Sequence, residues 1–112
     1  MVRKFYIPER GDLIWVNFNP VSGHEQFGKR PAVVISPEEY NAKTNLALVV
    51  PITSQKKGYP FEVEIFSKKI SGVALSDQVR SIDWKERKVE FISKLEIGVL
   101  REIQNKINKL IF

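Results

Sequence analysis

Apolar residues alternate along the first half of the chain with the period of β-strands. In residues 12–18, DLIWVNF, apolar side chains occupy both sides of the alternation, which predicts a central strand buried on both faces. The run RPAVVIS is expected to form a second strand that begins near Ala32, after Pro31, where a strand tolerates a missing donor. The run LALVVPIT predicts a third strand at residues 46–53.

Three later segments predict further strands. Residues 61–66, FEVEIF, alternate apolar residues with glutamates, which is typical of a half-exposed antiparallel strand. VALSDQVRSI, residues 73–82, and KVEFI, residues 88–92, have a weaker strand-like spacing. Between the second and third strands, EEYNAKTN is rich in turn-forming residues and is interpreted as a turn.

The hydrophobic period changes near Ser93, where a helix is expected to begin. Ser93 followed by Glu96 has the form of a capping box. Apolar residues then recur at helical spacing: Leu100, Ile103, Ile107, Leu110 and Ile111. Five or six short strands with one C-terminal helix favour a mainly β fold, a compact antiparallel barrel, over a parallel sheet. At 112 residues the chain, residues 1–112, has the size of a single domain.

The amino-acid composition excludes several kinds of functional site and indicates where the protein is located. The chain has no cysteine, which excludes disulfides, thiolate metal sites and a cysteine nucleophile. It has one histidine and no acidic residues at ligand spacing, so we expect no bound metal and no cofactor. No run of about 18 apolar residues is present, so a cytoplasmic location without a membrane span is expected. With 18 Lys and Arg against 13 Asp and Glu, the net charge of +5 favours acidic partners.

A polar loop precedes the second strand. Residues 23–30, GHEQFGKR, end in Arg30, whose guanidinium can bind a phosphodiester with two hydrogen bonds and stabilise negative charge on its oxygens. The alternative is a structural ion pair between Arg30 and Glu25. His24 is interpreted as a solvated loop residue, because a catalytic histidine needs a positioned partner.

A second polar loop, TSQKKGYP, begins at Thr53 where the third strand ends. If the second and third strands pair antiparallel, Arg30 and Thr53 become neighbours. Positive and aromatic side chains accompany this pair: Lys56, Lys57, Tyr59, Phe61 and Phe18. The aromatic faces are suited to stacking of single-stranded bases, whereas the alternative makes the lysines a solvated turn and places Phe61 in the core.

Four segments in order carry a family resemblance: GDLIWVNFNP, GHEQFGKRPAVVISP, VVPITSQKKGYPFEV and GVALSDQVRSIDW. They resemble the MazF (PemK-like) toxins of bacterial toxin-antitoxin pairs and cover nearly all of residues 11–84; KINKLI near the end is similar as well. The resemblance implies a small SH3-like barrel, a homodimer, and a metal-independent endoribonuclease acting on single-stranded RNA at short motifs. It also implies a cognate MazE-like antitoxin with an acidic tail, and contact with DNA only through that antitoxin. Residues 85–98 match the family least, and His24 and Lys29 match no family position.

The resemblance also implies which residues act. An Arg that opens the second strand and a Thr that ends the third are regarded as catalytic in the family, and these correspond to Arg30 and Thr53. The family's products, a 2′,3′-cyclic phosphate and a 5′-hydroxyl, imply attack by the neighbouring 2′-hydroxyl. On this reaction, Arg30 is suited to stabilise the charge of the phosphorane and Thr53 to orient the phosphate by hydrogen bonding. Glu25 is the nearest candidate base for the proton of the 2′-hydroxyl. The candidates for substrate contacts are Phe18, Gln26, Ser54, Gln55, Lys57 and Gln78.

Two other functions are compatible with such a fold. A gyrase poison of the CcdB type acts by binding a protein. That type ends in a Trp-Gly-Ile tail, whereas this chain ends in Leu110, Ile111 and Phe112. A catalytically inert RNA-binding barrel predicts RNA binding without new RNA ends. Gln78 has an alternative of its own, since a polar strand residue can equally face solvent or a subunit interface.

Overall fold

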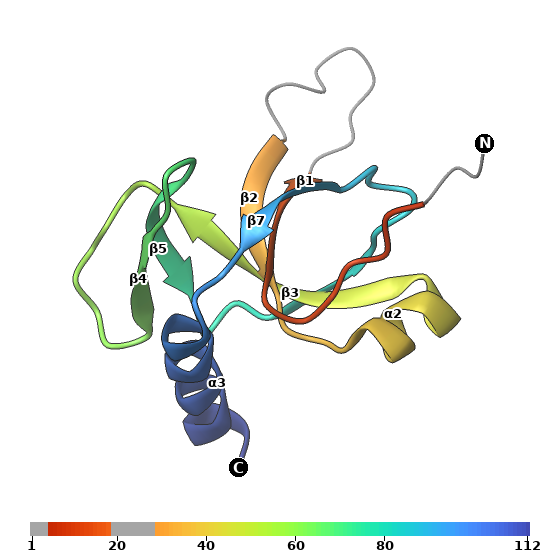
Figure 1. Ribbon diagram of the computed structural model, residues 1–112. Helices are drawn as coiled ribbons and strands as arrows, with labels where there is room; N and C mark the ends of the chain where they lie inside the picture. The colour runs from red at the N-terminus through yellow and green to blue at the C-terminus, as the bar shows by residue number, and fades with distance from the viewer. Residues whose placement is uncertain (1–4, 19–28) are drawn as a thin grey trace.

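The computed structural model describes residues 5–18 and 29–112. These residues form seven strands and two helices: β1 (Asp12–Asn17), β2 (Lys29–Val34), α2 (Glu38–Thr44), β3 (Leu46–Thr53), β4 (Glu62–Phe66), β5 (Ser71–Leu75), β6 (Arg80–Asp83), β7 (Glu90–Lys94) and α3 (Ile97–Ile111). The strands pair antiparallel, and the sheet curls into a half-barrel with α3 beside β4 and β5 (Figure 1). The predicted mainly β fold with a C-terminal helix is therefore confirmed.

Strand β3 is the centre of the sheet, because it pairs with three other strands. Its first half, Leu46–Val49, pairs with β6, and residues 49–51 pair with β2. Its last two residues, Ile52 and Thr53, pair with β5. The strand order is β4-β5-β3-β2-β1-β7, with β6 joined to this path at β3. The end of β3 therefore lies between β5 and the beginning of β2.

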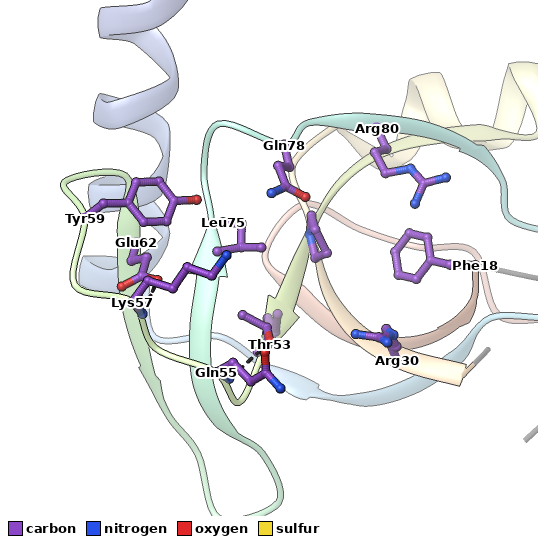
Figure 2. Close-up of a pocket in the computed structure, with 12 residues that line it drawn as sticks. Phe18, Arg30, Thr53, Gln55, Lys57, Tyr59, Glu62, Leu75, Gln78 and Arg80 are labelled. Carbon is purple, nitrogen blue, oxygen red and sulfur yellow. Dashed lines mark hydrogen bonds between the residues drawn. The ribbon is translucent and has the colours of Figure 1, made fainter. Parts of the chain in front are cut away.

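The register of β2 against β3 brings the two strand ends together. Ala32 lies opposite Pro51, so Arg30, two residues earlier, is level with Thr53, two residues later. Figure 2 shows both side chains at the rim of one pocket. The expected neighbours are confirmed, but β2 begins at Lys29 and not near Ala32, because β1 already pairs with Lys29.

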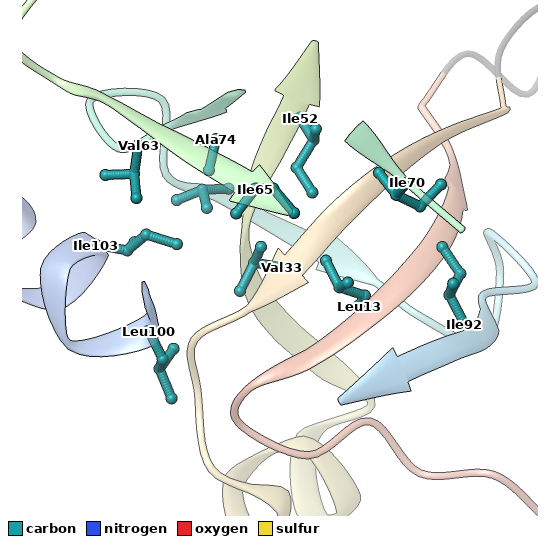
Figure 3. Close-up of a cluster of buried hydrophobic side chains, with 11 residues drawn as sticks. Leu13, Val33, Ile52, Val63, Ile65, Ile70, Ala74, Ile92, Leu100 and Ile103 are labelled. Atoms are coloured by element: carbon teal, nitrogen blue, oxygen red, sulfur yellow. The ribbon is translucent and has the colours of Figure 1, made fainter. Parts of the chain in front are cut away.

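The core has two parts, one on each face of the central strands. The first cluster lies between the sheet and α3, and Figure 3 shows Leu100 and Ile103 of the helix facing it. The second lies on the other face of the sheet. In β1, Leu13 belongs to the first cluster, whereas Ile14 and Val16 belong to the second. The prediction that this strand is buried on both faces is confirmed.

The segment interpreted as a turn, EEYNAKTN, instead forms helix α2. Only Asn41 is buried among the residues of this helix, so no apolar stripe marked it in the sequence. Glu38 and Glu39 in its first turn and Lys43 in its last favour the helix dipole. Asn45 ends it in the left-handed conformation at φ 61°, which asparagine tolerates.

Three predicted boundaries in the second half are also wrong. Residues 73–82 form parts of two strands, β5 and β6, because a turn closed by the hydrogen bond from Gln78 N to Leu75 O (3.0 Å) separates them. The last strand, β7, lies two residues later than expected and includes Ser93. Consequently Ser93 caps nothing: α3 begins after Glu96, which makes no side-chain capping bond.

Helix α3 packs with only part of its apolar stripe. Leu100 and Ile103 are buried, whereas Leu110 and Ile111 are 50% and 62% exposed. The apolar stripe of α3 therefore continues beyond the part that the sheet covers. In the parts of the chain that the structure describes, no helix has both the length and the apolar character that crossing a membrane requires.

A buried carboxylate joins the N-terminal segment to the sheet. Asp12, only 1% exposed, accepts hydrogen bonds through Oδ2 from the Tyr6 hydroxyl (2.6 Å) and from Glu9 N (3.0 Å). Its Oδ1 lies 2.8 Å from Lys94 Nζ. Burial, and then the hydrogen bond to Asp12, raise the pKa of Tyr6 above its usual value, and the hydrogen bond to Asp12 raises the pKa of Lys94.

These two shifts predict a loss of stability in alkali. Because both pKa values are raised in the folded chain, the contribution of each group is complete below the unfolded pKa, about 10, and is lost as the pH rises above it. We expect the free energy of unfolding, measured with urea, to fall as the pH increases from about 9.5 to 11.5. Tyr6→Phe should make this fall shallower, whereas Tyr40→Phe, at an exposed tyrosine of α2, should leave its slope unchanged. Equal slopes in the two variants would contradict the prediction.

Candidate functional site

A pocket of about 350 Å³ opens where β2, β3 and the β5–β6 connection meet. Several side chains of the described residues surround it in Figure 2: Phe18, Arg30, Thr53, Gln55, Lys57, Tyr59, Glu62, Leu75, Gln78 and Arg80. We call this the first pocket. Three of these residues are cationic and one, Glu62, is acidic, so the first pocket carries an excess of positive charge suited to an anionic ligand.

Arg30 and Thr53 form the rim of the first pocket. Arg30 is exposed near the start of β2, opposite Val16 of β1, and forms no ion pair with any residue that the structure describes. The Thr53 hydroxyl oxygen accepts a hydrogen bond from Gln55 N (3.1 Å), drawn as a dashed line in Figure 2. This bond fixes the oxygen and leaves the hydroxyl proton free to be donated to a ligand.

The loop between β3 and β4 is held by a carboxylate. Both oxygens of Glu62 accept backbone hydrogen bonds, from Lys57 N (2.9 Å) and Gly58 N (2.8 Å). This clamp holds the backbone of Lys57 at the edge of the first pocket, into which its side chain extends (Figure 2). Lys56 pairs with Glu64 and does not line the first pocket, so only one of the two lysines contributes charge there.

The opposite wall consists of Phe18 and Arg80. Phe18 is only 7% exposed, and the guanidinium carbon of Arg80 lies 4.8 Å from the centre of its ring. The cation covers one face of the aromatic ring. A planar nucleobase that enters the first pocket therefore meets the guanidinium plane of Arg80 on this wall. Figure 2 shows the two side chains facing each other.

Two described groups of the first pocket are engaged in hydrogen bonds within the protein. Tyr59 donates its hydroxyl to Asp77 Oδ1 (2.9 Å), and partial burial, followed by that bond, raises the pKa of Tyr59 to about 12. Tyr59 is therefore neutral near pH 7. Glu62, the one carboxylate among the described lining residues, is occupied by two backbone donors.

The structure brings together most of the residues predicted from the sequence. Six line the first pocket: Phe18, Arg30, Thr53, Gln55, Lys57 and Gln78. Ser54 lines a neighbouring pocket that also contains Arg30 and Thr53. Glu25, Gln26 and His24 lie outside the described residues. Lys29 pairs with Glu90 of β7 and lines neither pocket.

Sequence reasoning missed Arg80, which a sequence signal could have revealed. Gln78 and Arg80 are separated by one residue, Val79, and both line the first pocket. Alternation along an extended segment places residues i and i+2 on one side, so the choice of Gln78 already implied Arg80. Within residues 5–18 and 29–112, no three Asp, Glu or His side chains lie close enough together to hold a metal ion.

Gly72 sets the position of Thr53. The two residues belong to the paired strands β5 and β3, in which Val73 lies opposite Thr53. A Cβ atom built on Gly72, whose φ is +151°, would lie 2.5 Å from the Thr53 carbonyl oxygen. Glycine is therefore needed at this position for the close approach of the two backbones.

Replacing Gly72 with alanine should displace Thr53 and lower the rate of any reaction that depends on it. We expect the kcat of such a reaction to fall about tenfold, because misplacing a participating group by a fraction of an ångström has effects of this order. The rate should be measured where circular dichroism shows the variant to be folded. Gly98→Ala in α3, where a Cβ meets only Glu96 Oε1 at 3.3 Å, is the matched control and should keep full activity. A Gly72→Ala protein as active as Gly98→Ala would refute this positioning role.

Known proteins are similar to this chain in sequence and in fold. A family model described as the PemK-like, MazF-like toxin of type II toxin-antitoxin systems matches residues 9–111. The endoribonuclease toxin MazF of Escherichia coli (strain K12) is 52% identical over 106 residues, which are 95% of this chain and 96% of that protein. The crystal structure of MazF (Form-I) from Deinococcus radiodurans matches with a TM-score of 0.85 at 46% identity, covering 95% of this chain and 97% of that chain.

A structure that contains a partner matches equally well. It is the MazE-MazF crystal structure (Form-III) from Deinococcus radiodurans, with a TM-score of 0.85 at 43% identity, covering 94% of this chain and 96% of that chain. The family match spans the strands that build the first pocket and helix α3. The chain therefore belongs to the family of PemK-like, MazF-like toxins of type II toxin-antitoxin systems.

Proposed function

We propose that this protein is a metal-independent, sequence-specific endoribonuclease that cleaves single-stranded messenger RNA in the cytoplasm, with residues 1–112 as one catalytic domain. The observation that carries the proposal is the meeting of Arg30 and Thr53 at the rim of a cationic pocket. The endoribonuclease name of the Escherichia coli relative supports the class of reaction. The cationic lining supports a polyanionic substrate.

The reaction is an attack of the ribose 2′-oxygen on the adjacent phosphorus. The new bond joins the 2′-oxygen to phosphorus, and the bond from phosphorus to the 5′-oxygen of the next nucleotide breaks. A base takes the proton of the 2′-hydroxyl, and the departing 5′-oxygen receives a proton. The products are a 2′,3′-cyclic phosphate and a 5′-hydroxyl, and the charge that needs stabilising is on the phosphorane oxygens.

Arg30 supplies that stabilisation. Its guanidinium keeps its charge at all physiological pH values and offers a planar fork of donors to two phosphate oxygens. A group with so high a pKa is a poor carrier of protons, so its role is electrostatic. The place of Arg30 at the rim of the cationic first pocket supports this role.

Thr53 orients the phosphate. Its oxygen accepts the Gln55 backbone N–H, so its remaining proton is donated to a phosphate oxygen. Glu25, in the loop before β2, is the base that takes the 2′-hydroxyl proton. This assignment agrees with the described groups, since the Glu62 carboxylate is already occupied by backbone donors.

Other pocket residues hold the RNA on either side of the reacting phosphate. Amides read base edges with paired donors and acceptors, which suits Gln26, Gln55 and Gln78. Lys57 neutralises backbone charge, and Ser54 bonds to phosphate or ribose oxygens. Phe18 contributes to the base-binding wall through its contact with Arg80.

Two protein partners complete the proposal. A MazE-like antitoxin with an acidic tail covers the same cations as the RNA, and any contact with DNA passes through that antitoxin. A second copy of this chain forms a homodimer. The exposed apolar end of α3, with Leu110 and Ile111 at 50% and 62% exposure, supports a protein interface.

The test incubates the purified protein with a long unstructured RNA in the presence of EDTA and maps the ends produced. We expect cuts at a recurring short motif, with 5′-hydroxyl ends, and their loss in Arg30→Ala and Thr53→Ala. Cuts that survive both substitutions would mean that the site is elsewhere. RNA binding without any cut would identify an inert RNA-binding barrel instead.

A further inference from the structure

A second pocket of about 540 Å³ borders the first along Arg30, Ile52, Thr53 and Gln55, which line both. Its other lining residues come from β1, β2, the position after β3, the turn between β4 and β5, and the start of β5: Trp15, Pro31, Ser54, Lys69, Ile70 and Ser71. Trp15 packs against the first core cluster, shown in Figure 3, whereas Phe18 of the first pocket belongs to the other cluster. The two pockets therefore open on different sides of the Arg30–Thr53 rim.

The second pocket is positively charged. Arg30 and Lys69 contribute cations, and none of its described lining residues is acidic. The Lys69 ammonium donates to the Ile92 carbonyl oxygen (3.4 Å), which leaves its charge uncompensated, and it forms no ion pair within the described residues. A cation held in this way attracts an anion more strongly than one paired with a carboxylate.

The backbone around Lys69 is fixed. The Ser67 hydroxyl oxygen accepts bonds from Lys69 N (3.1 Å) and Ile70 N (3.4 Å), and Ser67 N donates to Ile70 O (3.2 Å). The Ile70 side chain is buried in the first core cluster. Lys69 is therefore presented from an anchored turn, which lowers the entropy lost when it binds a ligand.

The chemistry of the second pocket suits a nucleotide. Lys69 can neutralise a phosphate, the hydroxyls of Ser54 and Ser71 can bond to ribose or phosphate oxygens, and half-buried Trp15 offers an apolar wall. An RNA strand whose reacting phosphate lies between Arg30 and Thr53 must continue in both directions from the rim. The two pockets offer one site on each side of that rim.

We propose that the second pocket binds the nucleotide on the opposite side of the cleaved bond from the first pocket, with Lys69 contacting a flanking phosphate. This inference rests on the proposed endoribonuclease function. It makes Lys69 a substrate-binding residue for one side of the cut, and it assigns the two halves of the recognised RNA to opposite faces of the sheet edge.

The test compares Lys69→Gln with Lys68→Gln, because Lys68 is the exposed neighbouring lysine and lines neither pocket. With an RNA oligonucleotide that contains the mapped motif, Lys69→Gln should lower kcat/KM about fivefold, mainly through KM. The slope of log kcat/KM against log salt should become shallower by about 0.7, the value for one phosphate contact on a single strand. Lys68→Gln should match the wild type in both respects.

Shortened oligonucleotides locate the contact. Removing the flanking nucleotides on one side of the cut should make the kcat/KM values of Lys69→Gln and wild type equal. Removing those on the other side should preserve the difference between the two kcat/KM values. If Lys69→Gln behaves like Lys68→Gln on the full oligonucleotide, the second-pocket proposal is overturned while cleavage by the wild type still supports the enzyme. If the wild type itself cuts no RNA, the proposed function fails as well.

Discussion

Replacing Arg30 with lysine is expected to lower the single-turnover rate of RNA cleavage about a hundredfold, and replacing it with alanine about a thousandfold. Lysine keeps the charge but loses the fork that reaches two phosphate oxygens together. Arg30 can supply that fork because β2 begins one residue earlier and β1 pairs with it at Val16, so its backbone is fixed at the rim of both pockets.

The kinetic constants distinguish this role from simple attraction of RNA. If Arg30 stabilises charge that develops only in the transition state, kcat should fall far more than KM rises in the lysine variant. Arg101→Lys, on the exposed surface of α3 and away from both pockets, is the matched control and should keep the wild-type rate. A rate for Arg30→Lys within threefold of the control would contradict the electrostatic role.

Replacing Asn41 with alanine is expected to cost about 3 kcal/mol of stability, because it removes a fully buried side chain with three hydrogen bonds. Its Oδ1 accepts the Ser36 hydroxyl (2.6 Å), and its Nδ2 donates to Pro8 O (2.8 Å) and Ser36 O (3.1 Å). The Ser36 hydroxyl oxygen in turn accepts a hydrogen bond from Leu48 N (2.9 Å). Asn41 thus joins the N-terminal segment, α2 and β3.

The measurement is thermal unfolding followed by circular dichroism. A loss of about 3 kcal/mol corresponds to a fall of about 15 °C in Tm for a chain of this size. Asn45→Gly, at the C-cap of the same helix, is the control, because glycine adopts the left-handed conformation of that position readily and Tm should change little. A fall of less than 5 °C in Asn41→Ala would show that water replaces the lost amide.

The strands could be predicted where burial leaves a periodic signal. The strands β1 and β3 have buried residues on both faces, which made their apolar runs recognisable, and the expected antiparallel pairing of the second and third strands led to the meeting of Arg30 and Thr53. Helix α2 left no such signal, because its one buried residue, Asn41, is polar. The capping box at Ser93 was a local pattern that the pairing of β7 with β1 overrode.

The residues of the candidate site likewise fall into those that the sequence could predict and those that it could not. The first pocket could be predicted because its residues lie at strand ends or two apart along one segment, as Gln78 and Arg80 do. Lys69 could not, since only the pairing of β5 with the end of β3 brings its turn beside Thr53. The roles of Glu25 and Gln26 stay predictions, because both lie outside the described residues.

The triple pairing of β3 has a consequence for the newly made chain. Its partners extend to β6, which ends at Asp83, and the first core cluster also needs Leu100 and Ile103 of α3. A ribosome-bound chain that lacks these residues cannot complete the sheet, so Arg30 and Thr53 cannot be held together during most of translation. A growing copy of this toxin should therefore be unable to cleave RNA until nearly the whole chain has left the ribosome.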